Sequence, residues 1–207
     1  MSLAVALTAF FVLLPVELPD KTFIATLVLA TRYRPLLVWI GVGAAFFVHT
    51  LVAVTAGGLI GLLPRTPVTL AVAALFGVGA VLLWRGAAKA DGNEWQTERE
   101  LGAKVGESAS GAGPFRSVAT SFGVLMLAEW GDLSQLFTAG LVVRYDDPVS
   151  VFIGAWLALL LISGLGALVG RALLARVRLA LVQRVAAGVC LLLAGLTLLD
   201  AAGVQVL

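Results

Sequence analysis

Apolar residues fill six long stretches of the chain, separated by short segments that contain polar residues or proline. Each stretch is longer than the ~20 residues that an α-helix needs to cross a bilayer. We therefore predict an all-α polytopic membrane protein with six transmembrane helices. The expected spans are residues 3–31, 36–62, 67–90, 115–143, 149–174 and 180–204. The one long polar segment, 91–114, is expected to be a solvated linker.

The two halves of the chain repeat one pattern of polar residues. In each half, an acidic residue is followed three positions later by a second acid and five positions later by a hydroxyl residue. The two copies of this pattern are 112 residues apart. Further residues match between the two halves in the same order, which predicts an internal duplication. The expected parts are a three-helix repeat at 1–90, a cytoplasmic linker at 91–114 and a second three-helix repeat at 115–207. The matching pairs are Glu17/Glu129, Asp20/Asp132, Thr22/Ser134, Thr26/Thr138, Arg32/Arg144 and Tyr33/Tyr145.

Lys and Arg residues are unevenly divided between the two sides of the membrane. Eleven of the 14 follow the first, third and fifth spans, whereas only Arg65 and Arg144 lie on the other side. The positive-inside rule then places both termini outside the cytoplasm. With three spans in each half, the second half enters from the opposite face, which gives the inverted repeat of many secondary transporters. The excess of Arg over Lys favours a bacterial source, and hence the inner (plasma) membrane.

Acidic residues near the centres of apolar spans require an explanation. A buried carboxylate is costly, and an ionisable group at membrane depth indicates a functional site. The spacing of three residues puts both acids of each half on one helix face. Because corresponding midplane positions converge in an inverted repeat, we predict one metal site made by Glu17, Asp20, Glu129 and Asp132. Such oxygen ligands suit Ca²⁺, Mn²⁺ or Mg²⁺.

Neutral oxygens near the acids are expected to support the site. Pro19 lacks an N–H and pushes away the carbonyl of Pro15, so we expect the first span to be kinked or broken at its motif. Gly131 gives the second motif flexibility without that block. The supporting residues are Thr22, Thr26, Ser134, Gln135 and Thr138.

The charge of the predicted site suggests how transport is coupled. Four ionised carboxylates and Lys21 sum to a charge of −3, and one divalent cation reduces this to −1. Carboxylates held close together oppose one another's ionisation, so some should carry protons when the metal is absent. Exchange of protons for the cation is the simplest neutral cycle. Lys21 either neutralises an acid locally or takes part in transport, and His49 is either a proton relay or a packed, hydrogen-bonded imidazole.

The two acidic stretches resemble the paired signatures of the Gdt-like cation exchanger family, Glu-x-Gly-Asp-(Lys/Arg)-(Thr/Ser). The resemblance covers essentially the whole chain and implies transport of Mn²⁺ or Ca²⁺ in exchange for protons, with the motif acids as ligands. Pro19 replaces the expected glycine and Leu133 the expected basic residue, so this site is more negative than the family pattern. The stretches read Glu17-Leu18-Pro19-Asp20-Lys21-Thr22 and Glu129-Trp130-Gly131-Asp132-Leu133-Ser134-Gln135.

Three functional hypotheses follow. The first is a transporter, not an enzyme, that exports Mn²⁺ or Ca²⁺ in exchange for protons and needs no cofactor. The second, an exporter of a small organic cation or amino acid, requires a pocket that the sequence does not reveal. The third, an intramembrane lipid-phosphate hydrolase, requires Arg or His beside the acids, yet the arginines lie at helix ends. The expected partners are the metal ion, protons and the bilayer; nucleic acid is not implied, and a homo-oligomer is compatible with the sequence.

Overall fold

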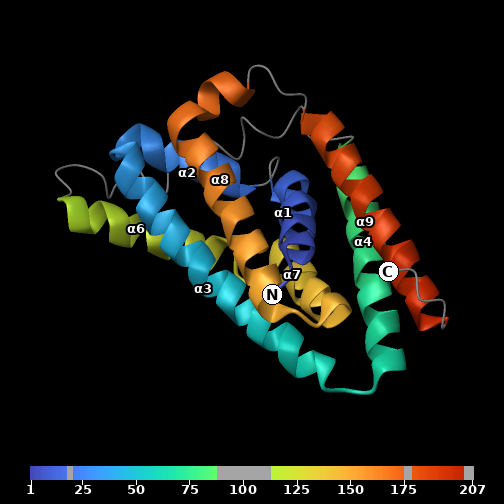
Figure 1. Cartoon of the computed structure of the whole chain (residues 1–207). Coiled ribbons are helices and arrows are strands. Elements are labelled where there is room, and N and C mark those ends of the chain that lie inside the picture. The colour runs from blue at the N-terminus through green and yellow to red at the C-terminus, as the bar shows by residue number, and fades with distance from the viewer. Residues whose placement is uncertain (18–20, 88–112, 175–178, 203–207) are drawn as a thin grey trace.

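The computed structural model describes residues 1–17, 21–87, 113–174 and 179–202. Within these ranges the secondary structure consists of eight α-helices, which confirms the predicted all-α class. The predicted linker, 91–114, lies almost entirely outside the described residues. The helices are α1 (Leu3–Glu17), α2 (Lys21–Arg32), α3 (Pro35–Gly61), α4 (Arg65–Ala87), α6 (Pro114–Ala128), α7 (Leu133–Tyr145), α8 (Pro148–Leu174) and α9 (Leu179–Ala201) (Figure 1).

Four of the described helices are long and apolar enough to cross a membrane. They comprise Pro35–Gly61, Arg65–Ala87, Pro148–Leu168 and Ala180–Ala201, in agreement with the predicted second, third, fifth and sixth spans. Pro35 and Pro148 stand at the first positions of α3 and α8, where a missing N–H costs no helical hydrogen bond. The chain is therefore a polytopic membrane protein.

The predicted fourth span, 115–143, consists of two helices. The helix α6 ends at Ala128, and α7 begins at Leu133. Between them Gly131 has a φ of 78°, a left-handed conformation that glycine adopts without steric cost. Asp132 then caps α7 through its side chain, so the second motif ends one helix and starts the next.

The predicted first span, 3–31, also consists of two helices. The helix α1 runs through Pro15 to Glu17, and α2 begins at Lys21. Their axes point in different directions (Figure 1), in agreement with the predicted kink or break at the first motif. Pro19, to which that prediction attributed the break, lies outside the described residues.

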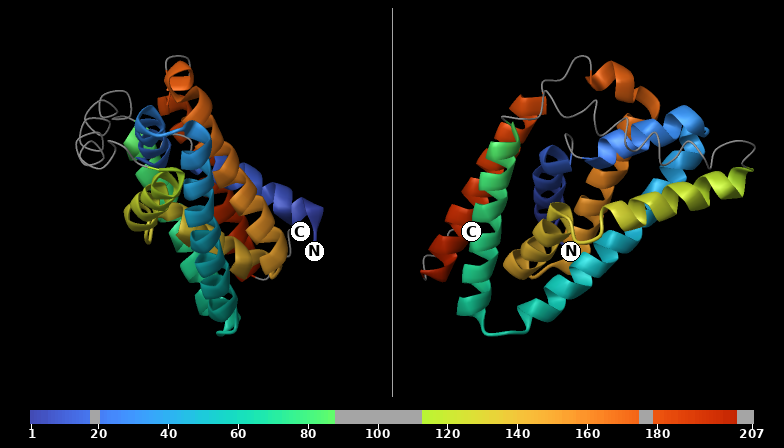
Figure 2. Two further views of the ribbon diagram at one scale, coloured as in Figure 1. Left: turned by 90° about the vertical axis from the view of Figure 1, so that its left-hand side faces the viewer. Right: turned by 180° about the vertical axis from the view of Figure 1, so that it is seen from behind.

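The long helices form the frame around the two motifs. Helices α3 and α8 cross, α4 and α9 lie side by side, and α1 and α7 lie between these pairs (Figures 1 and 2). Two indole N–H groups link the crossing helices: Trp39 Nε1 donates to the Leu160 carbonyl at 2.9 Å, and Trp156 Nε1 donates to the Gly43 carbonyl at 3.1 Å. Such hydrogen bonds, together with close packing, hold helices together where lipid removes the hydrophobic driving force.

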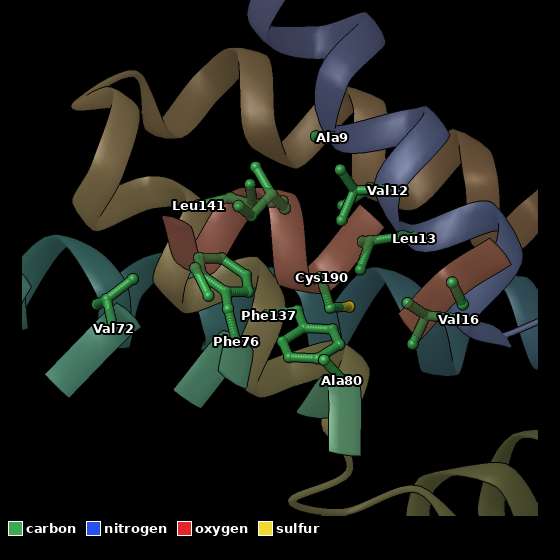
Figure 3. Packing of buried hydrophobic residues seen from close by; sticks show 14 of the residues in the cluster. Ala9, Val12, Leu13, Val16, Val72, Phe76, Ala80, Phe137, Leu141 and Cys190 are labelled. Carbon is green, nitrogen blue, oxygen red and sulfur yellow. The ribbon is translucent and has the colours of Figure 1, made fainter. Parts of the chain in front are cut away.

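Apolar side chains fix α7 between α1, α4 and α9 (Figure 3). Phe76 of α4 and Phe137 of α7 are fully buried, with their ring centroids 5.4 Å apart. Cys190 of α9 is a free cysteine that packs beside them and beside Leu13 of α1 (Figure 3). This cluster anchors the helix that follows the second motif.

Two glycines let helices cross with their backbones in contact. A Cβ atom at Gly154 of α8 would collide with the carbonyl oxygen of Ala6 in α1, and one at Gly41 of α3 would collide with the carbonyl oxygen of Val118 in α6. Small residues at such crossings allow the close packing that stabilises membrane helices. The crossings hold α1 and α6, the helices that lead into the motifs, against the long helices.

We predict that Gly154→Ala lowers the free energy of unfolding by about 1–3 kcal/mol, the usual cost of overpacking. Gly58→Ala in α3 is the matched control, because a Cβ there meets nothing within 4 Å. That control should be neutral or stabilising by up to about 1 kcal/mol through helix propensity. Thermal unfolding of the detergent-solubilised chain compares the two, and equal melting temperatures would contradict the tight crossing.

Candidate cation site

The second acidic motif forms the connection between α6 and α7. Glu129 follows α6 directly, and its N–H donates to the Leu125 carbonyl at 3.1 Å. Asp132 is the N-cap of α7: its Oδ1 accepts from the Gln135 N–H at 3.0 Å, and its Oδ2 accepts from Ser134 Oγ at 2.9 Å. The cap satisfies a backbone N–H that the start of a helix otherwise leaves open.

The side-chain amide of Gln135 joins this connection to α3. Its Nε2 donates to the Glu129 carbonyl at 3.0 Å and is hydrogen-bonded to Nδ1 of His49, while its Oε1 accepts from the Gly131 N–H at 3.3 Å. The His49 ring also meets Trp130 edge-on, with 5.8 Å between centroids. The imidazole is therefore packed and hydrogen-bonded, and a role in proton transfer stays a prediction.

A small cavity of about 10 Å³ lies where α3 meets α7. This is close to the space that one water-sized sphere requires. Carboxylate, hydroxyl and amide oxygens around such a space are ligands that hard divalent cations prefer. The polar lining consists of Asp132, Ser134, Gln135 and Thr138 on the α7 side and His49 and Thr50 on α3, and the apolar lining consists of Phe46, Ala53 and Leu159.

The hydroxyl groups on the α7 side donate their protons to acceptors of the protein itself. Ser134 Oγ donates to Asp132, and Thr138 Oγ1 donates to the Ser134 carbonyl at 2.7 Å. A hydroxyl has one proton and two acceptor lone pairs, so these two oxygens can act only as acceptors toward the cavity. Together with the Asp132 carboxylate, they favour a cation over an anion.

The predicted site residues are only partly brought together at this cavity. Asp132, Ser134, Gln135, Thr138 and His49 line it. Glu129 is buried and does not line the cavity, although its backbone carbonyl accepts from Gln135, which does.

In the first half, Glu17 is buried at the end of α1, and Thr26 is buried in α2 beside Gly166 of α8. Neither residue lines the cavity. Asp20 lies outside the described residues, and no side-chain placement is described for Lys21 or Thr22. The described side chains include no group of three or more His, Cys, Asp or Glu that could hold a metal, so the four-carboxylate site stays a prediction.

Thr50 lines the cavity although it was not among the predicted site residues. The available sequence signal was weak: Thr50 follows His49 directly, and a second hydroxyl residue, Ser163, occurs 113 positions later. A threonine in an apolar helix is otherwise common, since its hydroxyl can bond to the carbonyl one turn earlier.

A larger polar cavity of about 460 Å³ lies at the other end of α7. Its charged lining residues are Arg65, Arg144, Asp146 and Asp200. Arg144 Nη1 lies 2.8 Å from Asp200 Oδ2 and donates to Thr197 Oγ1 at 2.7 Å. The two cationic and two acidic groups balance, so the cavity has no excess negative charge. We therefore assign the candidate cation site to the smaller cavity.

Long apolar helices, a helix broken at an acidic motif and buried carboxylates define a polytopic membrane protein with an internal polar site. The model of the family described as "Divalent cation/proton antiporter GDT1" matches residues 5–91 and 117–205. The chain therefore belongs to the GDT1 family of divalent cation/proton antiporters. This confirms the resemblance seen in the two motifs and the prediction of a transporter rather than an enzyme.

Curated relatives have the same family name or a related one. GDT1-like protein sll0615 of Synechocystis sp. is 35% identical over 142 residues, which cover 66% of this chain and 69% of the relative. GDT1-like protein 3 of Arabidopsis thaliana is 28% identical over 184 residues, which cover 82% of this chain and 62% of the relative. The "Putative manganese exporter" of Vibrio cholerae is 31% identical over 186 residues, which cover 86% of this chain and 82% of the relative. No solved structure matches the chain.

The two roles of Asp132, helix cap and site carboxylate, can be separated by substitution. We predict that Asp132→Ala lowers the free energy of unfolding of the metal-free protein by about 1 kcal/mol, because the N-cap is lost. Asp132→Asn should lose less stability than Asp132→Ala, because the remaining amide oxygen caps equally well and only the bond from Ser134 Oγ is lost. Denaturation of both variants in a chelator-containing buffer measures this difference, and equal losses in the two would refute the capping role.

Proposed function

We propose that this protein exports a divalent metal cation, Mn²⁺ first and Ca²⁺ second, in exchange for protons. The observation that carries the proposal is the small cavity, about the size of one ion, that is lined by Asp132 and by residues with neutral oxygens. Membership of the GDT1 family supports cation/proton exchange, and the name of the Vibrio cholerae relative supports manganese. A cavity of this size favours a single small ion over an organic cation or an amino acid.

The proposed architecture is a pair of inverted three-helix repeats, 1–90 and 115–207, joined by a cytoplasmic linker at 91–114. Helix lengths support the duplication: α1 to α4 have 15, 12, 27 and 23 residues, and α6 to α9 have 15, 13, 27 and 23. The pairs α1–α2 and α6–α7 would then each form one broken span, which gives six spans in total. Broken spans at corresponding positions frame the ion sites of many transporters.

The glycine crossings support the same arrangement. Gly41 and Gly154 differ by 113 positions, and their partners Ala6 and Val118 differ by 112, as the duplication requires. Each crossing joins a long helix of one half to the broken span of the other half. In each half, the long helix would thus pack against the helix that leads into the motif of the other half.

The proposed ligands are the acids of both motifs, Glu17, Asp20, Glu129 and Asp132. Thr22, Thr26, Ser134, Gln135 and Thr138 would supply neutral oxygens, while Lys21 and His49 would balance charge or transfer protons. When the cation leaves, clustered carboxylates repel one another, and uptake of protons relieves the repulsion. Return of the empty site with protons bound would complete the exchange.

The proposed location is a bacterial inner membrane with both termini outside the cytoplasm. Eleven Lys and Arg residues would then lie on the cytoplasmic side and two on the opposite side. In this orientation, export uses a proton gradient directed inward.

Flux into proteoliposomes with an imposed pH gradient tests the proposal. We predict gradient-driven Mn²⁺ uptake by the wild type and at least about a tenfold loss in Glu129→Gln, since loss of even a group that only orients a metal ligand typically costs 10–100-fold. Asp147→Asn is the control, because Asp147 lies at the start of α8 and its carboxylate accepts from the Ser150 hydroxyl at 2.6 Å, away from the cavity. Flux that ignores the pH gradient, or that persists in Glu129→Gln, would count against proton exchange through this site.

A further inference from the structure

We infer that Thr50 of α3 is an additional ligand of the transported cation and binds it from the helix opposite the second motif. The inference rests on the proposed function. Thr50 lines the same cavity as Asp132, Ser134 and Thr138, and its side chain is 2% exposed. It belongs to neither acidic motif and lies in the first half of the chain, whereas Asp132 lies in the second.

The hydrogen bond of Thr50 leaves its oxygen available to a cation. Its Oγ1 donates to the Phe46 carbonyl at 2.7 Å, one turn earlier in α3. Because the single proton is used within the helix, only lone pairs remain for an occupant of the cavity. The hydroxyl of Thr138 on α7, the facing helix, likewise donates its proton within its own helix, to the Ser134 carbonyl. Thr50, Thr138 and Asp132, two hydroxyl residues and one carboxylate, therefore line a space about the size of one ion.

Close packing of α3 on α7 supports this role. Phe46, Thr50, Ala53 and Gly57 follow one another at spacings of three or four and share one face of α3. A Cβ at Gly57 would lie 2.6 Å from the Ala139 carbonyl oxygen, so the two backbones are nearly in contact there. This contact brings the face that carries Thr50 against α7.

The same hydroxyl recurs in the other half of the chain. Ser163 of α8 lies 113 positions after Thr50, is fully buried, and donates through Oγ to the Leu160 carbonyl at 3.1 Å. Its neighbour Ile162 corresponds to His49, so the hydroxyl recurs at this position while the imidazole does not. An ion held between Thr50 and Asp132 would connect the two halves, and its binding would favour one relative position of them.

Three substitutions separate a ligand from a merely structural threonine. Thr50→Val removes the oxygen at almost constant volume, and Thr50→Ser keeps it. Thr55→Val is the matched control, because Thr55 makes the same bond within α3, to the Leu51 carbonyl at 2.7 Å, but is exposed and does not line the cavity. Calorimetric titration of the full chain in detergent with Mn²⁺ should show at least about a tenfold loss of affinity in Thr50→Val, within the 10–100-fold range known for groups around metals. Thr50→Ser and Thr55→Val should stay within about twofold of the wild type, a smaller change than that range.

Equal Mn²⁺ affinity in Thr50→Val and the wild type would overturn this inference and leave the proposed function standing. Absence of Mn²⁺ binding by the wild type would instead overturn the proposed function. If Thr50→Val does not fold, Thr50→Cys provides the test, because a thiolate ligand favours Zn²⁺ over Mn²⁺. The ratio of Zn²⁺ to Mn²⁺ affinity should then rise at least about tenfold, and an unchanged ratio would exclude Thr50 as a ligand.

Discussion

A carboxylate among membrane helices is stable only where hydrogen bonds, protons or a cation compensate for its lost hydration. Asp132 illustrates one solution, because its two oxygens accept hydrogen bonds from Gln135 and Ser134 while the residue starts α7. Glu17, the last residue of α1, and Glu129, which directly follows α6, are buried. These acids therefore lie where the described helices end or begin.

A helix break inside a membrane protein creates a second requirement, because the freed backbone groups also need partners. In the second motif, Gln135 meets part of this need by accepting from the Gly131 N–H and donating to the Glu129 carbonyl. The same amide contacts His49 of α3, so the broken segment is tied to a long helix. Packing of Phe137 in the core then fixes the rest of α7, and the site acquires a defined shape.

The sequence alone could predict the helical class, the four long spans and most of the polar lining of the cavity, because apolar length and the acidic motif are local features. It could not predict the break within 115–143. Glycine is compatible with both a helix and a left-handed turn, and only the surroundings of Gly131 decide between them. Thr50 was missed for a different reason: its sequence context is that of any helical threonine, and its proximity to Asp132 depends on how α3 packs against α7.

In the proposed mechanism, the motif acids exchange protons for a metal ion. Isothermal titration of Mn²⁺ into the detergent-solubilised chain, at one pH but in buffers of different ionisation enthalpy, counts the protons released on binding. We predict that the observed enthalpy depends on the buffer, with a slope of about one proton or more per ion, because carboxylates must deprotonate to bind metal. Mn²⁺ binding with an enthalpy independent of the buffer would contradict it.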